Sequence, residues 1–484
     1  KDAFQSANVE GGFPAFSKAV MSLSNGYDVE EAIKDAYHLA KSGKPGPVVI
    51  EFPFDKQKAE GVYRERDPEH YRRRYGHESH MSPDQCGRFF SMLSKSRKPL
   101  MYIGGGLNSE EGSRAMREFN SLFGIPYVNT LMAKGVMDEK RDGLSLGMLG
   151  MYGTPAANKA IQEADFFFAV GCRWDDRVAD KVGEFGPKAQ IAYIDQNEDK
   201  VREIIRERNP AFTFVGDAKS ALKDLAEHSK LTGNVLDIRQ WQEEAADMKR
   251  KWQPSYDAGT GFLQEAEVID MLNRHLYDED DLKITTGVGN HQMFSAQYMK
   301  MSRPKSFITS GSFGTMGFAM PAAVGACYAN PGSKIIAIDG DGSNLMNSGE
   351  LSKIAEYGLP VKILLLNNNA DGMVKSYQKR FYGANYVGSL RNPERSFAGI
   401  AQAHGFPYAA RVDGRDGLAG AMEDFLYSEG PSMLEVVTDI EEDVYPFIPP
   451  GKGYEEMLLG PNIKETDKTQ SAAMMGMNGR QEPG

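Results

Sequence analysis

The stretch from Lys334 to Met373 limits the possible folds of this chain more than any other part of the sequence. It contains an apolar run at 335–338, a turn of glycine and aspartate, a segment with helical spacing from about residue 347, and a second apolar run at 361–366. Short continuous apolar runs are typical of strands that are buried on both faces of a parallel sheet. The stretch therefore predicts one βαβ unit, in which a right-handed crossover makes the two strands parallel.

Polar residues follow each of these two predicted strands. Residues 340–343 (GDGS) follow the first strand, and residues 367–369 (NNN) follow the second. The carboxyl ends of parallel strands lie at one edge of a sheet, where open α/β folds bind their ligands. A carboxylate from Asp341 and an amide oxygen from Asn368, with glycines that let the backbone approach closely, suit Mg²⁺ that holds a diphosphate. The N-terminus of the predicted helix would add its positive end to this anion site.

Either motif alone is more often an ordinary turn or loop than a binding site. Here the two occur together, with Asp341 and Asn368 27 residues apart and each at a predicted strand end. The residues by themselves therefore predict a Mg²⁺-diphosphate site and nothing more specific.

Composition excludes several other classes of protein. The chain has 484 residues, enough for two or three domains. Its formal net charge of −11 argues against a protein that binds nucleic acid or an anionic membrane surface. No apolar run approaches the roughly 18 residues of a membrane span. The three cysteines are far apart and form no CxxC pair, which indicates a reducing compartment and no zinc site.

The chain divides into segments with different patterns. At the start, one amphipathic helix (28–41) and one strand (47–52) are too little to enclose a core, because domains usually have about 50–250 residues. Two stretches, 56–82 and 228–263, are polar and are interpreted as linkers. We therefore expect the C-terminal part of a domain at 1–55, a linker at 56–82, a whole α/β domain at 83–227, a second linker at 228–263, a second whole domain at 264–445, and a tail at 446–484 with a disordered end.

The expected domain at 83–227 shows a doubly wound, Rossmann-like pattern of alternating strands and helices. Three of its predicted strands end in glycine-rich or polar turns, at 104–106, 171–173 and Asp195. The predicted strands are 100–103, 126–130, 166–170 and 190–194.

Arg173 and Arg177 are the strongest candidates for ligand contacts in this domain. Forked guanidinium groups at a strand end suit phosphate. An ion pair with Asp175 or Asp176 accounts for the same residues about equally well, so the residues alone leave both interpretations open.

The pair of GDG and NN, with its spacing, resembles the thiamine diphosphate (ThDP) signature of the ThDP-dependent decarboxylases and synthases. Further phrases are similar to the catalytic subunit of acetohydroxyacid synthase, also called acetolactate synthase. They follow that family's order from the first residues to about Leu459. These phrases are DAFQ (2–5), SGKPGPV, LGMLGMYG (146–153), GCRWDDRV, TTGVGNHQ (285–292), SGSFGTMGFAMPAA, GDGS, VKILLLNNNADGMV and VYPFIPPG.

The resemblance implies an α/β fold with doubly wound parallel sheets in three domains. These are a pyrimidine-binding domain, of which only the end would be present, a central FAD-binding domain and a diphosphate-binding domain. The implied cofactors are ThDP, Mg²⁺ and a structural FAD that performs no redox step. The implied reaction is the decarboxylation of pyruvate and transfer of its hydroxyethyl group to a second 2-keto acid, giving 2-acetolactate or 2-aceto-2-hydroxybutyrate. This is the first common step of branched-chain amino acid biosynthesis.

The family's motifs also carry functional residues over to this sequence. Mg²⁺ would be held by Asp341, Asn368 and the backbone carbonyl of Ala370. ThDP would contact Val288, Gly289, Asn290, His291, Gly314, Met316, Gly342, Ser343, Gly372 and Met373, with Met373 as the apolar wedge that bends it. FAD would contact Gly104, Thr130, Leu131, Gly150, Gly171, Arg173, Arg177, Asp195 and Asp217. Phe4, Gln5, Met151, Asp176, Arg177, Met373 and Tyr377 would lie near the substrate.

Three departures from the family pattern affect these expectations. The glutamate that activates the aminopyrimidine of ThDP would lie before Lys1. The chain as given is therefore expected to be nearly inactive, because general acid–base help contributes roughly 10²–10⁴-fold. Tyr377 stands where the family usually has a tryptophan that selects 2-ketobutyrate, which leaves the acceptor preference open. Lys44 replaces an arginine that contacts FAD, and Phe54 replaces a lysine near the substrate channel.

The sequence leaves two alternatives open. One is another ThDP-dependent pyruvate decarboxylase or oxidase, and the other is a non-catalytic protein with ThDP-type domains. The family implies an active site between two subunits, hence a homodimer or larger assembly, and a small regulatory subunit as a partner. Pyruvate and a second 2-keto acid are the expected substrates, and no nucleic-acid or membrane partner is expected. The expected location is the cytoplasm, or the plastid for a plant or algal protein.

Overall fold

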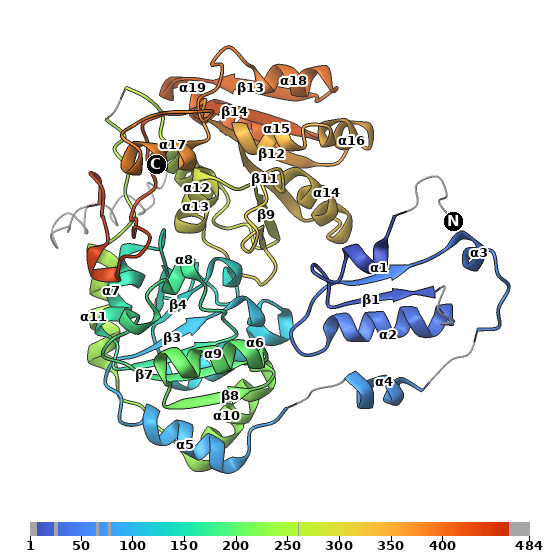
Figure 1. Cartoon of the computed structure of the whole chain (residues 1–484). Coiled ribbons are helices and arrows are strands. Elements are labelled where there is room, and N and C mark those ends of the chain that lie inside the picture. Colours follow the sequence, from blue (N-terminus) through green and yellow to red (C-terminus); the bar gives the residue numbers. More distant parts are fainter. Residues whose placement is uncertain (1–6, 24–27, 64–66, 76–78, 260, 464–484) are drawn as a thin grey trace, which may run out of the picture.

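The computed structural model describes residues 7–23, 28–63, 67–75, 79–259 and 261–463. These residues form two six-stranded sheets and one two-stranded sheet, and every pairing within the sheets is parallel. Figure 1 shows the two large sheets in separate bodies with helices around them, one from the middle of the chain and one from its C-terminal part. The chain therefore has the parallel α/β architecture that the sequence predicts.

The C-terminal sheet has the strand order β10-β9-β11-β12-β14-β13. The predicted βαβ unit lies at its centre, where β11 (Lys334–Gly340) pairs with β12 (Val361–Asn367) and Ile335 is opposite Val361. The other strands are β9 (Leu282–Thr286), β10 (Phe307–Thr309), β13 (Tyr408–Val412) and β14 (Ser432–Val437).

Both faces of this sheet are buried, as the continuous apolar runs predict. Ile336 and Ile338 belong to one hydrophobic cluster, and Ile335 and Ala337 belong to another, because successive side chains of a strand point to opposite faces. The helices of this domain are α12 (Glu265–His275), α13 (Asn290–Tyr298), α14 (Ala319–Ala329), α15 (Asp341–Met346), α16 (Glu350–Glu356), α17 (Gly372–Phe381), α18 (Phe397–Ala403) and α19 (Arg415–Tyr427).

The connection between β11 and β12 contains two helices, where the sequence predicted one beginning near residue 347. The predicted helix corresponds to α16, which begins at Glu350. The short helix α15 begins directly after β11, at Asp341, and was not predicted. Glycine, serine and asparagine make up half of its six residues, and these are weak helix formers, so local propensity gives no signal there.

The central sheet has the strand order β5-β4-β3-β6-β7-β8. Four of its strands confirm the predicted ones: β3 (Pro99–Ile103), β4 (Tyr127–Asn129), β6 (Phe166–Val170) and β7 (Gln190–Asp195). The two edge strands, β5 (Ser145–Met148) and β8 (Phe212–Val215), were not predicted, because four residues are too few for a clear periodic pattern.

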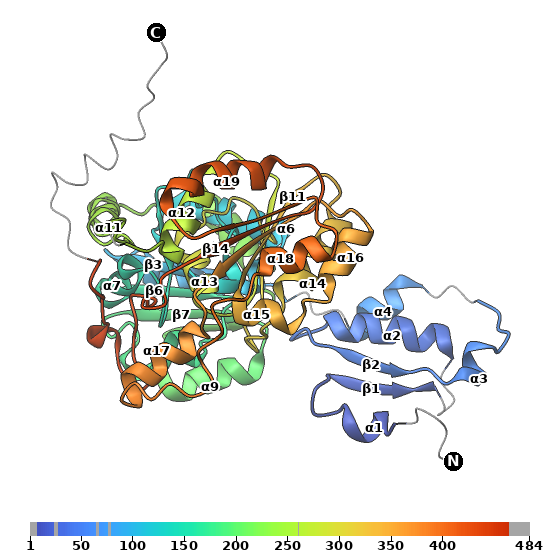
Figure 2. The ribbon, with the colours of Figure 1, turned by 90° about the horizontal axis from the view of Figure 1, so that it is seen from above.

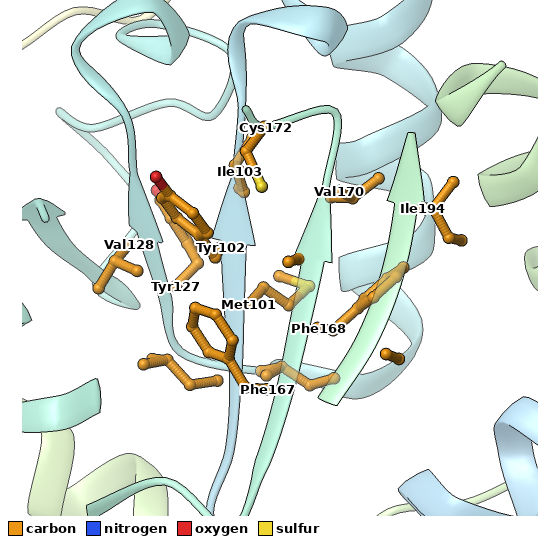
Figure 3. Packing of buried hydrophobic residues seen from close by; sticks show 14 of the residues in the cluster. Met101, Tyr102, Ile103, Tyr127, Val128, Phe167, Phe168, Val170, Cys172 and Ile194 are labelled. Atoms are coloured by element: carbon orange, nitrogen blue, oxygen red, sulfur yellow. The ribbon is translucent and has the colours of Figure 1, made fainter. Parts of the chain in front are cut away.

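Aromatic and aliphatic side chains fill the core of the central domain. Figure 3 shows Met101 and Tyr102 from β3 beside Phe167 and Phe168 from β6. Tyr102 and Phe167 stack with their ring centroids 5.5 Å apart. The helices here are α5 (Pro83–Leu93), α6 (Glu110–Phe123), α7 (Pro155–Glu163), α8 (Asp176–Ala179), α9 (Glu198–Arg208), α10 (Ala218–Thr232) and α11 (Arg239–Lys251).

The stretch at 228–263, expected as a polar linker, contributes to this core. It begins within α10 and contains α11. Trp241 of α11 is fully buried, and its Nε1 donates a hydrogen bond to the backbone carbonyl of Pro99 (2.8 Å). One face of the helix packs inward while the rest is charged, so its mean composition hides the buried stripe.

The N-terminal segment forms a small layer beside the two large domains (Figures 1 and 2). Its two strands, β1 (Ala19–Ser22) and β2 (Val48–Glu51), pair in parallel, and α2 (Val29–Lys41) connects them. The predicted helix and strand correspond to α2 and β2, whereas β1 was not predicted. The stretch at 56–82 contains α4 (Pro68–Tyr75), whose Tyr71 stacks on His38 of α2 (centroids 4.8 Å apart). Two short helices, α1 (Val9–Gly12) and α3 (Phe54–Gln57), complete the segment.

A buried ion pair lies where the two large domains meet. Nζ of Lys134 is 2.8 Å from Oε2 of Glu139, and these side chains are only 3% and 4% exposed. The backbone N–H of Glu139 donates to the carbonyl of Met301 (3.0 Å), which belongs to the C-terminal domain. Arg117 donates to the carbonyl of Ser302 (2.7 Å) across the same boundary. The two domains are thus joined by buried polar contacts as well as by the chain.

The segment after β14 returns to the central domain. The backbone N–H of Ile448 donates to the carbonyl of Met151 (3.0 Å), and the hydroxyl of Tyr454 donates to the carbonyl of Val178 (2.6 Å). The expected disordered end, 464–484, lies outside the described residues. Among the described helices, none has the length and apolar character needed to cross a membrane.

Candidate functional site

Asp341 and Asn368 come together at the carboxyl edge of the C-terminal sheet. Asp341 follows β11 directly as the first residue of α15, and Asn368 follows β12, the strand that pairs with β11. Both side chains are buried. The two predicted motifs therefore meet at one buried edge, as parallel pairing requires.

The carboxylate of Asp341 has one oxygen without a hydrogen bond. Its Oδ2 has no hydrogen-bond partner among the residues that the structure describes, and it lies 3.4 Å from Nε of Arg391. Burial raises the pKa of Asp341 to about 7, and the Arg391 guanidinium opposes this rise. A buried carboxylate oxygen that accepts no hydrogen bond is unfavourable by itself, and a bound cation would stabilise it.

Two hydrogen bonds orient the side chain of Asn368. Its Nδ2 donates to Oε1 of Glu265 (2.8 Å), and its Oδ1 accepts from the backbone N–H of Ala370 (3.1 Å). Asn369 has a φ of 55°, in the left-handed region, which turns the chain sharply after β12. Carboxylate, amide and backbone carbonyl oxygens are ligands that Mg²⁺ accepts. In the described parts of the chain, no group of three or more His, Cys, Asp or Glu offers a competing metal site.

Two glycines allow close packing at this edge. A Cβ added at Gly342 would lie 2.2 Å from Oδ1 of Asp371 and 2.6 Å from Nη2 of Arg391. A Cβ added at Gly372 would lie 2.5 Å from Nδ2 of Asn290. Any larger residue would displace these polar groups. Both positions therefore need glycine for these polar side chains to pack against the backbone.

A buried histidine and aspartate lie close to the same edge. Nε2 of His291 is 3.6 Å from Oδ1 of Asp339, on β11. Burial lowers the pKa of His291 to about 3 and raises the pKa of Asp339 to about 7, so both groups are held toward their neutral forms. Oγ of Ser343 accepts a hydrogen bond from the backbone N–H of Gly317 (2.9 Å), which joins α15 to the loop after β10.

The loops after β9 and β10 carry the other residues expected to contact ThDP. Val288 and Gly289 follow β9, and α13 begins at Asn290. Gly314 and Met316 lie in the loop between β10 and α14. Because β9 lies between β10 and β11 in the parallel sheet, these loops open on the same edge as the GDG turn.

A cavity of about 770 Å³ lies between the two large domains. Its volume is in the usual range for the binding pockets of small molecules and cofactors. Its walls come from the strand ends of the central sheet and from the loops of the C-terminal sheet. Of the predicted site residues, it is lined by Thr130, Leu131, Met151, Gly171, Arg173, Arg177, Val288, Gly314, Met373 and Tyr377.

Four residues expected to contact FAD do not line this cavity. Gly104 and Gly150 are each followed by residues that do line it. Asp195 is the buried last residue of β7. Asp217 caps α10, because its side chain accepts a hydrogen bond from the backbone N–H of Lys219 (3.0 Å). The cap gives Asp217 a structural role besides the FAD contact that the family resemblance implies.

Arg173 takes part in the ion pair that was one of the two interpretations from the sequence. Its Nη2 lies 2.7 Å from Oδ2 of Asp175, and its Nη1 donates to Oγ of Ser312 in the C-terminal domain (2.8 Å). It lines the cavity all the same, so the ion pair orients a group that a ligand can still reach. Arg177 also lines the cavity, with Nη1 3.8 Å from Sδ of Met151.

The residues expected near the substrate are brought together only in part. Met151, Arg177, Met373 and Tyr377 line the same cavity, the last two from α17. Asp176 is the exposed first residue of α8 and does not line it. Two further residues, Phe4 and Gln5, lie outside the described residues.

Two protein-family profiles match the chain. The family described as "Thiamine pyrophosphate enzyme, central domain" matches residues 87–225. The family described as "Thiamine pyrophosphate enzyme, C-terminal TPP binding domain" matches residues 287–436. The second match contains both β11 and β12, and with them the Asp341–Asn368 edge.

Named proteins from a plant, a bacterium and a yeast are similar over nearly the whole chain. Acetolactate synthase 2, chloroplastic, of Nicotiana tabacum is 36% identical, over 94% of this chain and 69% of its own length. The acetolactate synthase isozyme 2 large subunit of Escherichia coli is 34% identical, over 94% and 80%. The mitochondrial acetolactate synthase of Schizosaccharomyces pombe is 34% identical, over 95% and 70%. The chain belongs to the acetolactate synthase family. Its large parallel sheets are accordingly those of the ThDP-dependent enzyme fold.

Three residues at the Asp341–Asn368 edge were missed by the sequence reasoning. Arg391 approaches Asp341, Asp371 pairs with Arg391, and Glu265 accepts a hydrogen bond from Asn368. Glu265 precedes its partner by 103 positions, and no local pattern marks such a contact. Only Asp371 carried a signal, since it directly precedes a glycine of the NNNADG phrase.

Proposed function

We propose that this protein is an acetohydroxyacid-forming carboligase. It would decarboxylate pyruvate and join the hydroxyethyl group to a second 2-keto acid, giving 2-acetolactate or 2-aceto-2-hydroxybutyrate. The observation that carries the proposal is the buried edge where Asp341 follows β11 and Asn368 follows the neighbouring strand β12, with Oδ2 of Asp341 accepting no hydrogen bond from the described residues. Membership of the acetolactate synthase family supports the same reaction.

The residues present fit Mg²⁺ and ThDP. Asp341, Asn368 and the carbonyl of Ala370 would hold Mg²⁺, which prefers oxygen ligands and fills its remaining positions with phosphate and water. Gly342, Ser343 and the backbone after β9 would hold the diphosphate. When bound, ThDP supplies a thiazolium ring that takes up the electron pair released by decarboxylation.

The remaining residues would bind and orient the substrates. Arg177 and Arg173 present guanidinium groups to the cavity, and such groups suit the carboxylate of a 2-keto acid or a phosphate. Met373 and Tyr377 of α17 line the same cavity and would exclude water from the reacting carbonyl. The aromatic ring of Tyr377 would also limit the size of the second 2-keto acid.

The central domain would hold FAD as a structural group. Gly171 and Thr130 line the cavity. Gly104 does not line it, but it directly precedes Gly105, which does. We propose the domain division 1–55, 83–227 and 264–445 for the pyrimidine, FAD and diphosphate domains. The assembly would be a homodimer or larger, with a small regulatory subunit, because the related Escherichia coli protein is named a large subunit. The cytoplasm, or a plastid, would be its location.

The test is a product assay on protein expressed from the complete reading frame, with pyruvate, ThDP and Mg²⁺. Acetolactate is the expected product, and Asp341→Ala should abolish it while the exposed Asp416→Ala should not. Acetaldehyde, or a requirement for an electron acceptor, would indicate a sister decarboxylase or oxidase. No binding of ThDP would indicate a non-catalytic protein. Assaying the 484 residues in parallel tests whether a glutamate before Lys1 activates the cofactor.

A further inference from the structure

Glu265 is a buried acid whose role the proposed reaction leaves unexplained. It is the first residue of α12, and it is only 2% exposed. Its Oε1 accepts the hydrogen bond from Nδ2 of Asn368 (2.8 Å), and its Oε2 has no hydrogen-bond partner in the described part of the chain. A buried acid with a single side-chain partner costs stability, so a functional reason for it is needed.

Capping of α12 does not provide that reason. Acidic residues in a first turn are common because they satisfy free N–H groups and the helix dipole. Here Glu442 does this from a distant part of the chain, since its carboxylate accepts from the backbone N–H of Glu265 and from that of Ala266 (3.3 Å). The carboxylate of Glu265 is instead directed to Asn368.

An acceptor at this place fixes which end of the Asn368 amide is free. The amide has an oxygen end and an NH₂ end, and rotation about its last bond exchanges them. The Glu265 oxygen accepts a hydrogen bond from the NH₂ end, and the oxygen end points away from it toward Ala370. A hard divalent cation binds oxygen and not NH₂.

We propose that Glu265 is a positioning residue that holds Asn368 with its amide oxygen toward the metal ion. The inference rests on the proposed function, in which Asn368 is a metal ligand. Partners that orient a metal ligand in this way typically change metal affinity about 10–100-fold when they are removed.

The experiment measures Mn²⁺ affinity by electron paramagnetic resonance, with ThDP present, on the 484-residue chain. Glu265→Leu removes the acceptor and should weaken Mn²⁺ binding about 10–100-fold. Glu265→Gln keeps a carbonyl oxygen for Asn368 and should recover most of the affinity. The matched control is Glu267→Leu on the same helix, which breaks a partly buried ion pair with Arg415 (2.9 Å) and should leave Mn²⁺ affinity unchanged.

Asn368→Ala and the double variant separate the possible outcomes. If Glu265 acts through Asn368, the double variant Glu265→Leu/Asn368→Ala binds Mn²⁺ no more weakly than Asn368→Ala alone. Additive losses would mean that Glu265 acts on the metal by another route, which overturns the inference. Glu265→Leu with unchanged affinity would overturn it too, while a weakened Asn368→Ala would still support the proposed metal site. If Asn368→Ala also binds Mn²⁺ normally, or the unaltered chain binds no Mn²⁺, then both the proposed metal site and the positioning role of Glu265 are wrong.

Discussion

The guanidinium of Arg391 lies beside the carboxylate of Asp341, with Nε 3.4 Å from Oδ2. Its other end forms an ion pair with Asp371, and this pair packs over the backbone of Gly342. A positive charge therefore lies next to the oxygen that the proposed metal ion needs. The same charge would attract the diphosphate that accompanies the metal.

Replacing Arg391 by methionine should tighten the binding of Mn²⁺ in the absence of ThDP. A unit charge acting on a divalent ion over several ångströms is worth on the order of 1 kcal/mol even at the dielectric constant of water, which is severalfold in affinity. Asp371→Asn should act in the opposite direction, because it removes a negative charge and releases Arg391 toward Asp341. Titration of free Mn²⁺ measures both.

The opposite signs make this pair of variants informative. General disruption of the site would weaken Mn²⁺ binding in both variants. That result would contradict the idea that the Arg391 charge opposes metal binding at Asp341. Lys353→Met, which removes an exposed positive charge from α16, is the control and should change nothing.

Gly104→Ala should destabilise the central domain strongly. The backbone N–H of Gly104 donates to the carbonyl of Val170 (2.9 Å), which continues the pairing of β3 with β6 just beyond Ile103. An added Cβ would lie 1.9 Å from the carbonyl oxygen of Gly171, and this neighbour is backbone that cannot swing aside. We expect a loss of about 3 kcal/mol or more by urea unfolding, at the upper end for overpacking. Gly183→Ala, with open space around it, should cost much less.

The stability of the chain should depend on pH through Asp195. Burial raises its pKa from 3.8 to about 6, although the backbone N–H of Asn197 stabilises the charged form. Since the folded-state pKa is above the unfolded one, stability is fully present below about pH 4 and falls as pH rises through about 6.

Asp195→Asn removes that dependence. Relative to the unaltered chain, its stability gain should be near zero at about pH 4 and rise to about 3 kcal/mol above about pH 7. Urea unfolding across this range measures the difference. A gain that does not vary with pH would show that the charge of Asp195 is not the cause. FAD affinity should fall in the same variant if Asp195 contacts FAD, as the family resemblance implies.

Removing one partner of the Lys134–Glu139 ion pair should lower the free energy of unfolding strongly, whereas replacing both partners by apolar residues should not. Glu139→Gln leaves the buried ammonium of Lys134 without its counter-charge, and we expect a loss of about 3–5 kcal/mol. The double variant Lys134→Met/Glu139→Leu removes both charges and should recover most of that loss. If the double variant is as unstable as the single one, the loss comes instead from the hydrogen bond that the backbone N–H of Met301 donates to the Glu139 carboxylate (3.4 Å).

The central features of the fold could be predicted because their causes are local. Continuous apolar runs identified β11 and β12, and the polar residues at their ends identified Asp341 and Asn368. Parallel pairing then placed these two residues at one edge. The short edge strand β8 and the helix α15 were missed, because four residues and a glycine-rich turn carry too little periodic signal.

The contacts that tune the site could not be predicted in the same way. Glu265 and Arg391 reach the edge from other parts of the chain, and no local sequence pattern around them indicates a contact with Asn368 or Asp341. Trp241 was placed in a linker because its helix is mostly charged, while its single indole occupies the central core. Such contacts depend on the completed tertiary structure.

The cavity between the large domains links their folding to whatever they bind. Its walls include Thr130 and Arg173 from one domain and Val288 and Tyr377 from the other. A ligand that fills it touches both, so its binding free energy opposes their separation as well as the melting of either one. In calorimetry, the ligand-free chain can show two endotherms, and a saturating ligand merges them into one. Ligand concentration thus sets how many cooperative units the molecule has.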